Sequence, residues 1–123
     1  MIKNVLIVGL GGAAGSMLRY AVHKIFPAQS AAAFPSATLM VNIAGCLLIG
    51  MLWSMVSRSL TWNEEMKLLL MNGFCGGFTT FSAFTLEGIG LLKENKTSLF
   101  FVYLTASVVG GLLATFIGIR IAK

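Results

Sequence analysis

Long apolar stretches separated by short polar connections account for most of this chain. They cover residues 4–22, 37–56, 67–92 and 99–119. About 20 residues of α-helix cross the hydrocarbon core of a bilayer, so each stretch is long enough to span a membrane. The pattern predicts an all-α membrane protein, in which residues 1–123 form a single transmembrane domain of four helices.

The third stretch departs from this simple pattern. Its segment Gly73–Glu87 contains three glycines, four hydroxyl side chains and a carboxylate. Glycine destabilises a helix by about 1 kcal/mol relative to alanine, and hydroxyls compete for backbone hydrogen bonds. We therefore expect the third helix to break near Gly76 and Gly77. Broken helices in membranes are where transporters and channels place ion sites, so this segment is the candidate functional centre.

Two of the other stretches carry polar side chains on one face. Thr38 and Asn42 lie four residues apart in the second stretch, and Tyr103 and Ser107 have the same spacing in the fourth. Residues four apart share a helix face. The Asn42 amide either bonds to another helix or lines a polar path. Hydroxyls in membrane helices often bond to their own backbone, so the fourth stretch alone is weak evidence.

Aromatic and charged side chains flank the expected break. Phe81 and Phe84 are three residues apart on one face, and Thr80 shares a face with Phe84. Such a stripe either packs against other helices or lines a path. Glu87 is an acid close to the membrane interior that must pair, face water or be protonated. Arg19, in the first stretch, either reaches the interface or pairs within the protein. We expect them to have a vestibule or a structural role.

Composition agrees with a membrane protein. The chain is 57% hydrophobic and 11% charged, whereas charged residues make up about a quarter of soluble domains. Its net charge of +5 comes mainly from residues that flank the apolar stretches, which suits lipid headgroups and not nucleic acid. Cys46 and Cys75 lie within apolar stretches without a metal-ligand spacing, and we interpret them as packing residues.

Positive charge is nearly balanced between the two ends of the predicted helices. Five lysines and arginines fall on the side of the termini and four on the other, so the orientation rule barely discriminates. Two copies inserted in opposite orientations could then pair about a two-fold axis in the membrane plane. The residues counted are Lys3, Arg58, Lys67, Arg120 and Lys123 on one side, and Arg19, Lys24, Lys93 and Lys96 on the other.

The first stretch allows two other interpretations. Gly9, Gly11 and Ala14 fit the dinucleotide-binding pattern G-x-G-x-x-A, but the acidic residue expected about 20 positions later is missing, since the first acid is Glu64. A signal peptide is the second, but the segment continues beyond its small residues without a polar start, and we expect it to be retained. The favoured interpretation is a membrane helix whose Gly11 and Gly15 let another helix approach closely.

With these residues in view, the chain resembles the CrcB, or Fluc, family of fluoride channels along its whole length. The longest matching string is Gly-Gly-Phe-Thr-Thr-Phe-Ser-Ala-Phe, residues 76–84. The resemblance implies an antiparallel, dual-topology homodimer with two fluoride pores and a structural sodium ion at its centre. It also implies passive fluoride export across the bacterial inner membrane. The other matching residues are Gly11, Gly12, Gly15, Arg19, Asn42, Gly45, Glu87, Tyr103 and Ser107.

The resemblance also assigns roles to single residues. It implies that the backbone carbonyls of Gly76 and Thr79 hold the sodium ion. It further implies fluoride-pore roles for Asn42, Phe81, Phe84, Thr80, Ser82, Tyr103 and Ser107. Gly111 and Ala83 stand where related chains carry further hydroxyls, which leaves the details of the polar strip open.

Two other functions fit the sequence less well than a fluoride channel. A small proton-coupled multidrug or cation exporter commonly carries a carboxylate in its first span, and residues 4–22 contain none. A non-transporting assembly protein would leave the string around the break without a purpose. The chain is not expected to be an enzyme, because its single histidine, His23, stands alone at an interface.

Overall fold

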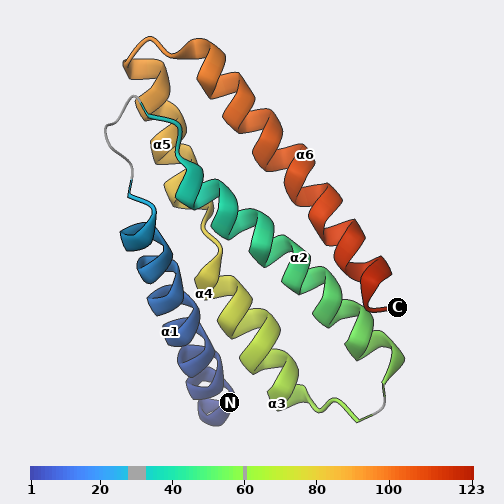
Figure 1. The fold of residues 1–123 in the computed structure, drawn as a ribbon. Helices are drawn as coiled ribbons and strands as arrows, with labels where there is room; N and C mark the ends of the chain where they lie inside the picture. The colour runs from blue at the N-terminus through green and yellow to red at the C-terminus, as the bar shows by residue number, and fades with distance from the viewer. Residues whose placement is uncertain (28–32, 60) are drawn as a thin grey trace.

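A computed structural model describes residues 1–27, 33–59 and 61–123, and every regular element in these ranges is helical (Figure 1). The predicted all-α class is therefore confirmed. Helices α1, α2 and α6 are long and apolar enough to cross a membrane. In chain order the elements are α1 (Ile2–Ile25), α2 (Ser36–Arg58), α3 (Glu64–Lys67), the π-helix η1 (Leu68–Cys75), α4 (Gly76–Phe78), α5 (Phe81–Lys93) and α6 (Thr97–Ile121).

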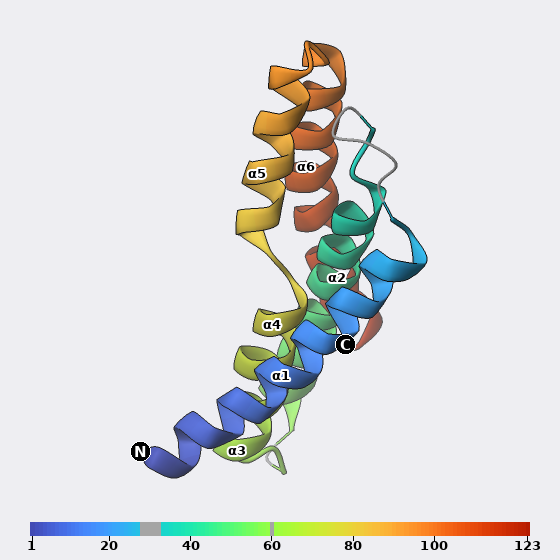
Figure 2. The ribbon, with the colours of Figure 1, turned by 90° about the vertical axis from the view of Figure 1, so that its left-hand side faces the viewer.

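The third apolar stretch is not one continuous helix. It begins at Glu64 as α3, continues through η1, ends as α4 at Phe78 and resumes as α5 at Phe81. Figure 2 shows α4 and α5 joined by an extended segment. The predicted break in this stretch is therefore present.

The break follows just after the glycines near which it was predicted. The extended residues are Thr79, with φ −83° and ψ 158°, and Thr80, with φ −150° and ψ 119°. Gly76 and Gly77 are helical and form the start of α4. Gly77 allows close packing instead, since a Cβ there would lie 2.9 Å from the Cα of Gly12 in α1.

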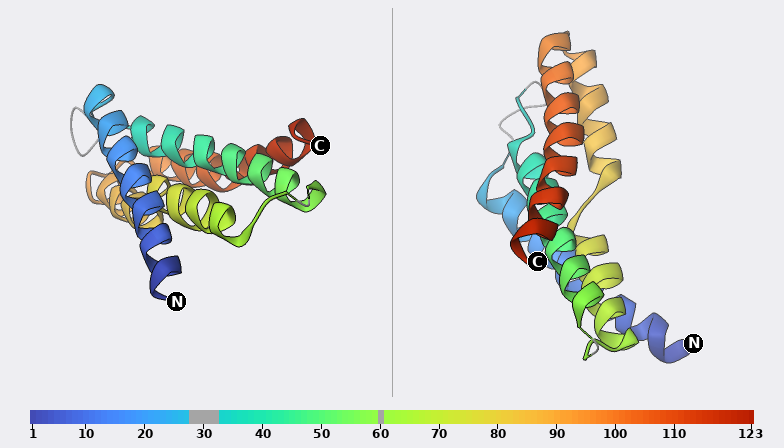
Figure 3. Two further views of the ribbon diagram at one scale, coloured as in Figure 1. Left: turned by 90° about the horizontal axis from the view of Figure 1, so that it is seen from below. Right: turned by 90° about the vertical axis from the view of Figure 1, so that its right-hand side faces the viewer.

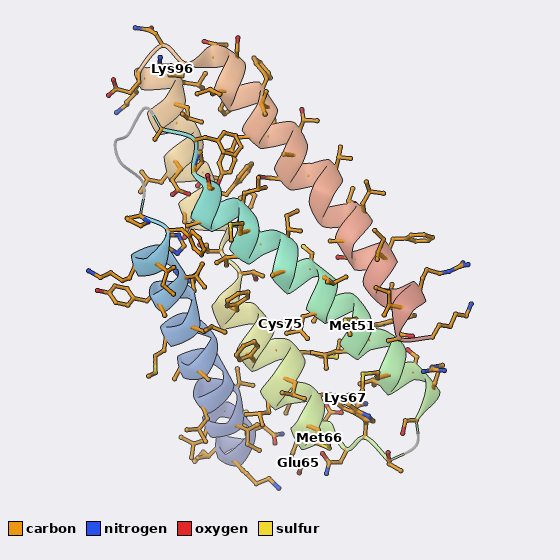
Figure 4. The ribbon with its side chains drawn as sticks, viewed as in Figure 1. Met51, Glu65, Met66, Lys67, Cys75 and Lys96 are labelled. Carbon is orange, nitrogen blue, oxygen red and sulfur yellow. The ribbon has the colours of Figure 1, made fainter. Side chains whose placement is uncertain are left out.

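The arrangement of the helices follows from a few close pairings. Helix α2 occupies the centre, with α6 on one side and α1 with η1 and α4 on the other, and α5 lies beside the first half of α6 (Figure 1). Seen from below, α1 crosses α2 and α6 at a clear angle (Figure 3). Glu65, Met66 and Lys67 lie at the opposite end of the molecule from Lys96 (Figure 4).

The connections were predicted at residues 26–36, 58–63 and 93–98. Residues 28–32 and 60 lie outside the described ranges, so the first two are only partly described. The third is a tight turn in which Asn95 has a φ of 59° and the Lys96 amide bonds to the Leu91 carbonyl at 2.8 Å. Asparagine tolerates this left-handed conformation, so α5 ends in a Schellman-type cap.

Glycines allow α1 to pack directly on the backbone of the third stretch. A Cβ added at Gly11 would lie 2.9 Å from the Phe74 nitrogen, and one at Gly15 would lie 2.7 Å from the Phe78 nitrogen. The predicted close approach at these glycines is therefore confirmed. Because the surrounding segment is continuous helix without a preceding strand, the dinucleotide-binding interpretation is wrong.

Helices α2 and α6 approach each other in the same way. A Cβ at Gly50 would lie 3.0 Å from the Thr115 carbonyl carbon, and one at Gly118 would lie 3.0 Å from the Met51 nitrogen. Small residues at such contacts drive helix association in lipid, where burial of apolar surface adds little. The fold thus depends on two glycine-mediated helix contacts, one on each side of α2.

We predict that Gly15→Ala destabilises the protein by about 1–3 kcal/mol, because the added methyl group overpacks the contact between α1 and α4. The measurement is thermal unfolding in detergent. Gly9→Ala is the matched control, since its Cβ would meet nothing within 4 Å and alanine favours the helix. Equal melting temperatures for the two variants would contradict the proposed contact.

Candidate functional site

One side chain of α2 satisfies the backbone at the break. The Asn42 Nδ2 donates to the Thr80 carbonyl oxygen at 3.0 Å, and the Thr80 amide donates to Asn42 Oδ1 at 2.8 Å. An unpaired backbone group in hydrocarbon costs several kcal/mol. This pair of bonds therefore stabilises an extended backbone at that depth. Of the two roles left open for Asn42, the bond between helices is confirmed.

The Thr80 side chain starts the next helix. Its hydroxyl accepts a hydrogen bond from the Ala83 amide at 3.1 Å, which is the N-cap arrangement for α5. The Ser82 hydroxyl is 3.4 Å from it and is exposed. Thr80 is therefore fixed by both its backbone and its hydroxyl.

These bonds leave two carbonyls without their helical donors. In a continuous helix the Gly76 carbonyl would accept from the Thr80 amide, and the Thr79 carbonyl from the Ala83 amide. Both amides bond to side chains instead. Gly76 is exposed and Thr79 is partly exposed. Neutral carbonyl oxygens of unwound helices are suitable ligands for a sodium ion.

Helix α1 bonds to the other side of the break. The Arg19 Nε donates to the Gly77 carbonyl at 3.1 Å, and the Ser16 hydroxyl donates to the same oxygen at 3.4 Å. The predicted vestibule or structural role of Arg19 thus includes a structural contact. The sequence analysis missed Ser16, although its spacing of three residues from Arg19 places both on one helix face.

A cavity of about 440 Å³ opens beside the break. It brings together residues from α2, η1, α4, α5 and α6, including most of the predicted site residues. The Ser107 hydroxyl is buried and has no hydrogen-bond partner among the described residues. The lining comprises Asn42, Gly45, Cys46, Ile49, Met71, Cys75, Gly76, Thr79, Thr80, Phe81, Phe84, Ser107 and Val108.

Three neighbouring aromatic rings from α5 and α6 form a row that begins at this cavity. The ring centroids of Phe81 and Phe84 are 5.7 Å apart, and those of Phe84 and Tyr103 are 5.1 Å apart. Phe81 is 77% exposed, so its ring projects from the surface of the single chain. Phe84 is only partly exposed and connects the exposed ring to the buried tyrosine.

Tyr103 is fully buried beside polar groups of two other helices. Its hydroxyl donates to Glu87 Oε1 at 3.3 Å and lies beside the hydroxyl of Thr38, which is also fully buried. Glu87 lines a second cavity of about 230 Å³. The predicted residues Thr38, Tyr103 and Glu87 are therefore one cluster, beyond Phe84 as seen from the break.

His23 joins this cluster, which the sequence analysis did not anticipate. Its Nδ1 is 2.9 Å from the Arg19 carbonyl oxygen and its Nε2 is 3.0 Å from the Thr38 hydroxyl. The only signal in the sequence was its spacing of four residues from Arg19, which does not reveal the contact with α2.

Comparison with known proteins identifies the family of this chain. The family model described as "CrcB-like protein, Camphor Resistance (CrcB)" matches residues 6–119. The chain belongs to this family. The resemblance predicted from the motifs is therefore confirmed.

Several relatives in the CrcB-like family bear the name "Fluoride-specific ion channel FluC". One from Flavobacterium psychrophilum is 42% identical over 121 residues, covering 98% of both chains. One from Phocaeicola vulgatus is 43% identical over 121 residues, covering 98% of this chain and 99% of the relative. A third, from Chlorobium luteolum, is 44% identical over 120 residues, covering 98% and 92%. These names denote an ion channel, in agreement with the expectation that the chain is not an enzyme.

For this CrcB-like chain we predict that Asn42→Ala destabilises the protein by about 2–4 kcal/mol, because two backbone groups at the break lose their partners. Unfolding in detergent measures the stability, and hydrogen exchange measures protection of the Thr80 amide. Ser57→Ala is the matched control on the same helix, since that hydroxyl bonds only to the Trp53 carbonyl one turn away. A Thr80 amide that stayed protected in Asn42→Ala would contradict this role.

Proposed function

We propose that the chain forms a fluoride-selective channel that exports fluoride passively across a bacterial inner membrane. The observation that carries the proposal is the cavity at the helix break, where phenylalanine rings, an amide and hydroxyls surround one space. The names of the relatives support the choice of ion. In this proposal α1, α2, the broken third stretch and α6 are the four spans of one multi-pass domain over residues 1–123.

The chemistry of the lining suits a small anion. Fluoride is strongly hydrated, so a selective path must replace its water with compact donors. Hydroxyls donate hydrogen bonds, and the edges of phenyl rings carry the positive end of the ring quadrupole. The Asn42 amide has one N–H left after its bond to Thr80, and the unpartnered Ser107 hydroxyl has its proton available. The described residues that line the cavity include no lysine or arginine, so none of them adds a fixed positive charge that would hold the anion too tightly to move.

The same path would continue past Phe84 to a vestibule. Tyr103, Thr38 and Glu87 follow the aromatic rings in space, and Thr80 and Ser82 border the path at the start of α5. Arg19 provides a positive charge on the α1 side of the break. In this proposal these groups line the path of the anion between the central cavity and water.

One chain supplies only one wall of the proposed pore. Phe81 is 77% exposed and Gly76 is exposed, although both lie at the centre of the proposed conducting region. A second copy would cover them. The near balance of positive charge between the two ends of the helices favours an antiparallel, dual-topology homodimer.

The freed carbonyls of Gly76 and Thr79 fit a sodium ion shared by two protomers. Each chain offers two neutral oxygens, and a two-fold axis through the break would bring two such pairs together. When bound there, the ion would supply positive charge close to the anion paths and pair the unsatisfied carbonyls.

The alternative of a proton-coupled exporter is not favoured. Helix α1 contains no acidic residue, and Glu87 hydrogen-bonds to Tyr103 near the end of the third stretch. A non-transporting assembly protein would need neither the break nor its polar lining.

We predict that Phe81→Ile or Phe84→Ile lowers fluoride flux by about fivefold, because a ring-edge contact worth about 1 kcal/mol is lost without much change in bulk. Purified protein in liposomes with a fluoride electrode measures the flux, and chloride serves as the comparison ion. Phe101→Ile, an exposed ring on α6, is the control and should conduct normally. Undiminished flux in both test variants would refute the ring contacts, and no fluoride flux in the unmodified protein would refute the channel.

We predict that replacing sodium with choline at constant ionic strength shifts the protein from dimer to monomer. A ligand at about 100 times its dissociation constant contributes about 2.7 kcal/mol to the state that binds it. Light scattering after size exclusion measures the oligomeric state, and restoring sodium should restore the dimer. A distribution that is the same in both salts would argue against the shared ion.

A further inference from the structure

His23 is the one histidine of the chain, and the proposed fluoride path gives it no role. It lies in the last turn of α1 and is partly buried. Both ring nitrogens have partners, the Arg19 carbonyl at 2.9 Å and the Thr38 hydroxyl at 3.0 Å. A histidine that contacted only lipid headgroups would not have both nitrogens bonded within the protein.

The partners of the ring determine its tautomer. The Arg19 carbonyl oxygen can only accept, so Nδ1 of His23 carries a proton in both charge states. In the neutral ring Nε2 is then an acceptor, and the Thr38 hydroxyl donates to it.

The same geometry accommodates the charged ring. Its Nε2–H would donate to the Thr38 oxygen, with the Thr38 hydroxyl turned so that a lone pair faces the ring. Both ring nitrogens therefore keep the same partners in the neutral and the charged state.

Few other charges face His23. Its own helix contributes Arg19, whose Nε is bonded to the Gly77 carbonyl, and the exposed Lys24. Helix α6 contributes Tyr103, and α5 contributes Glu87. The first turn of α2 and the sequence 26–35 contain no titratable side chain.

The second cavity is lined by His23 and Glu87, whose charges determine the electrostatic potential that an entering anion meets. Among the described residues that line its volume of about 230 Å³, only His23 and Glu87 are titratable. With a neutral imidazole, an approaching anion meets the carboxylate charge alone. With a protonated imidazole, that charge is offset by a positive charge across the same cavity.

We propose that His23 is the proton-sensitive residue at the mouth of the fluoride path, where its protonated ring offsets Glu87 and admits the anion. The inference rests on the proposed function, in which Thr38, Tyr103 and Glu87 border that path.

The first test is fluoride flux into liposomes at about pH 8 and about pH 6, with leakage of hydrogen fluoride subtracted from protein-free vesicles. We expect flux to rise about threefold on acidification, because one added positive charge raises the local anion concentration. His23→Gln should stay at the lower flux at both pH values, since its amide mimics the neutral ring. His23→Lys should stay at the higher flux.

Lys24→Gln is the matched control, because it removes an exposed charge one residue away and should retain the pH dependence. A His23→Gln protein with the pH dependence of the unmodified protein would overturn the proposal. Flux that is equal at both pH values in the unmodified protein would do the same.

A second test does not depend on conduction or on variants. The imidazole proton signal of the single histidine can be followed by NMR during pH titration of the unmodified protein, in sodium fluoride and in sodium gluconate. If fluoride binds about two- to threefold better beside the charged ring, reciprocal linkage raises the titration midpoint by about 0.3–0.5 pH in fluoride. Equal midpoints in the two salts would overturn the proposal. An absence of flux with a fluoride-dependent midpoint would instead refute the channel and leave the role of His23 in anion binding.

Discussion

The structure depends on one constraint, that backbone amides and carbonyls inside a bilayer must have partners. The backbone of the third stretch leaves the helical conformation at Thr79 and Thr80. The Asn42 side-chain amide bonds to both the N–H and the carbonyl group of Thr80. The cavity, the freed carbonyls and the exposed start of α5 all follow from this exchange of partners. A neutral amide at this position stabilises the break without placing a charge in the lining.

Local sequence predicted the kind of fold but not the detailed position of its break. The lengths of the apolar stretches correctly predicted the helices α1, α2 and α6. Each end of these helices lies one to three residues beyond its predicted bound. Helix propensity pointed to Gly76 and Gly77 for the break. Both glycines are helical, and Gly77 provides the close contact with α1. Thr80 leaves the helix, and its backbone is bonded to Asn42, a residue 38 positions earlier. Such a long-range bond is invisible to propensity.

The sequence predicted many residues of the candidate site but few of the contacts between them. Spacing along single helices identified Phe81 with Phe84, and Tyr103 with Ser107, and the structure adds the contact between Phe84 and Tyr103. The partners of Arg19 and His23 depend on how α1 crosses its neighbours, which no periodicity within α1 encodes. The contacts that link these residues come from the packing of different helices.

The two halves of the third stretch belong to different packing groups. Helix α4 lies against α1, which holds the Gly77 carbonyl through Arg19, whereas α5 lies against α6 and is tied at Thr80 to α2. The extended pair Thr79 and Thr80 therefore connects the two packing groups. Because neither residue lies within a helix, their backbone dihedral angles can absorb a displacement of α1 with α4 relative to α5 with α6 without breaking a helical hydrogen bond.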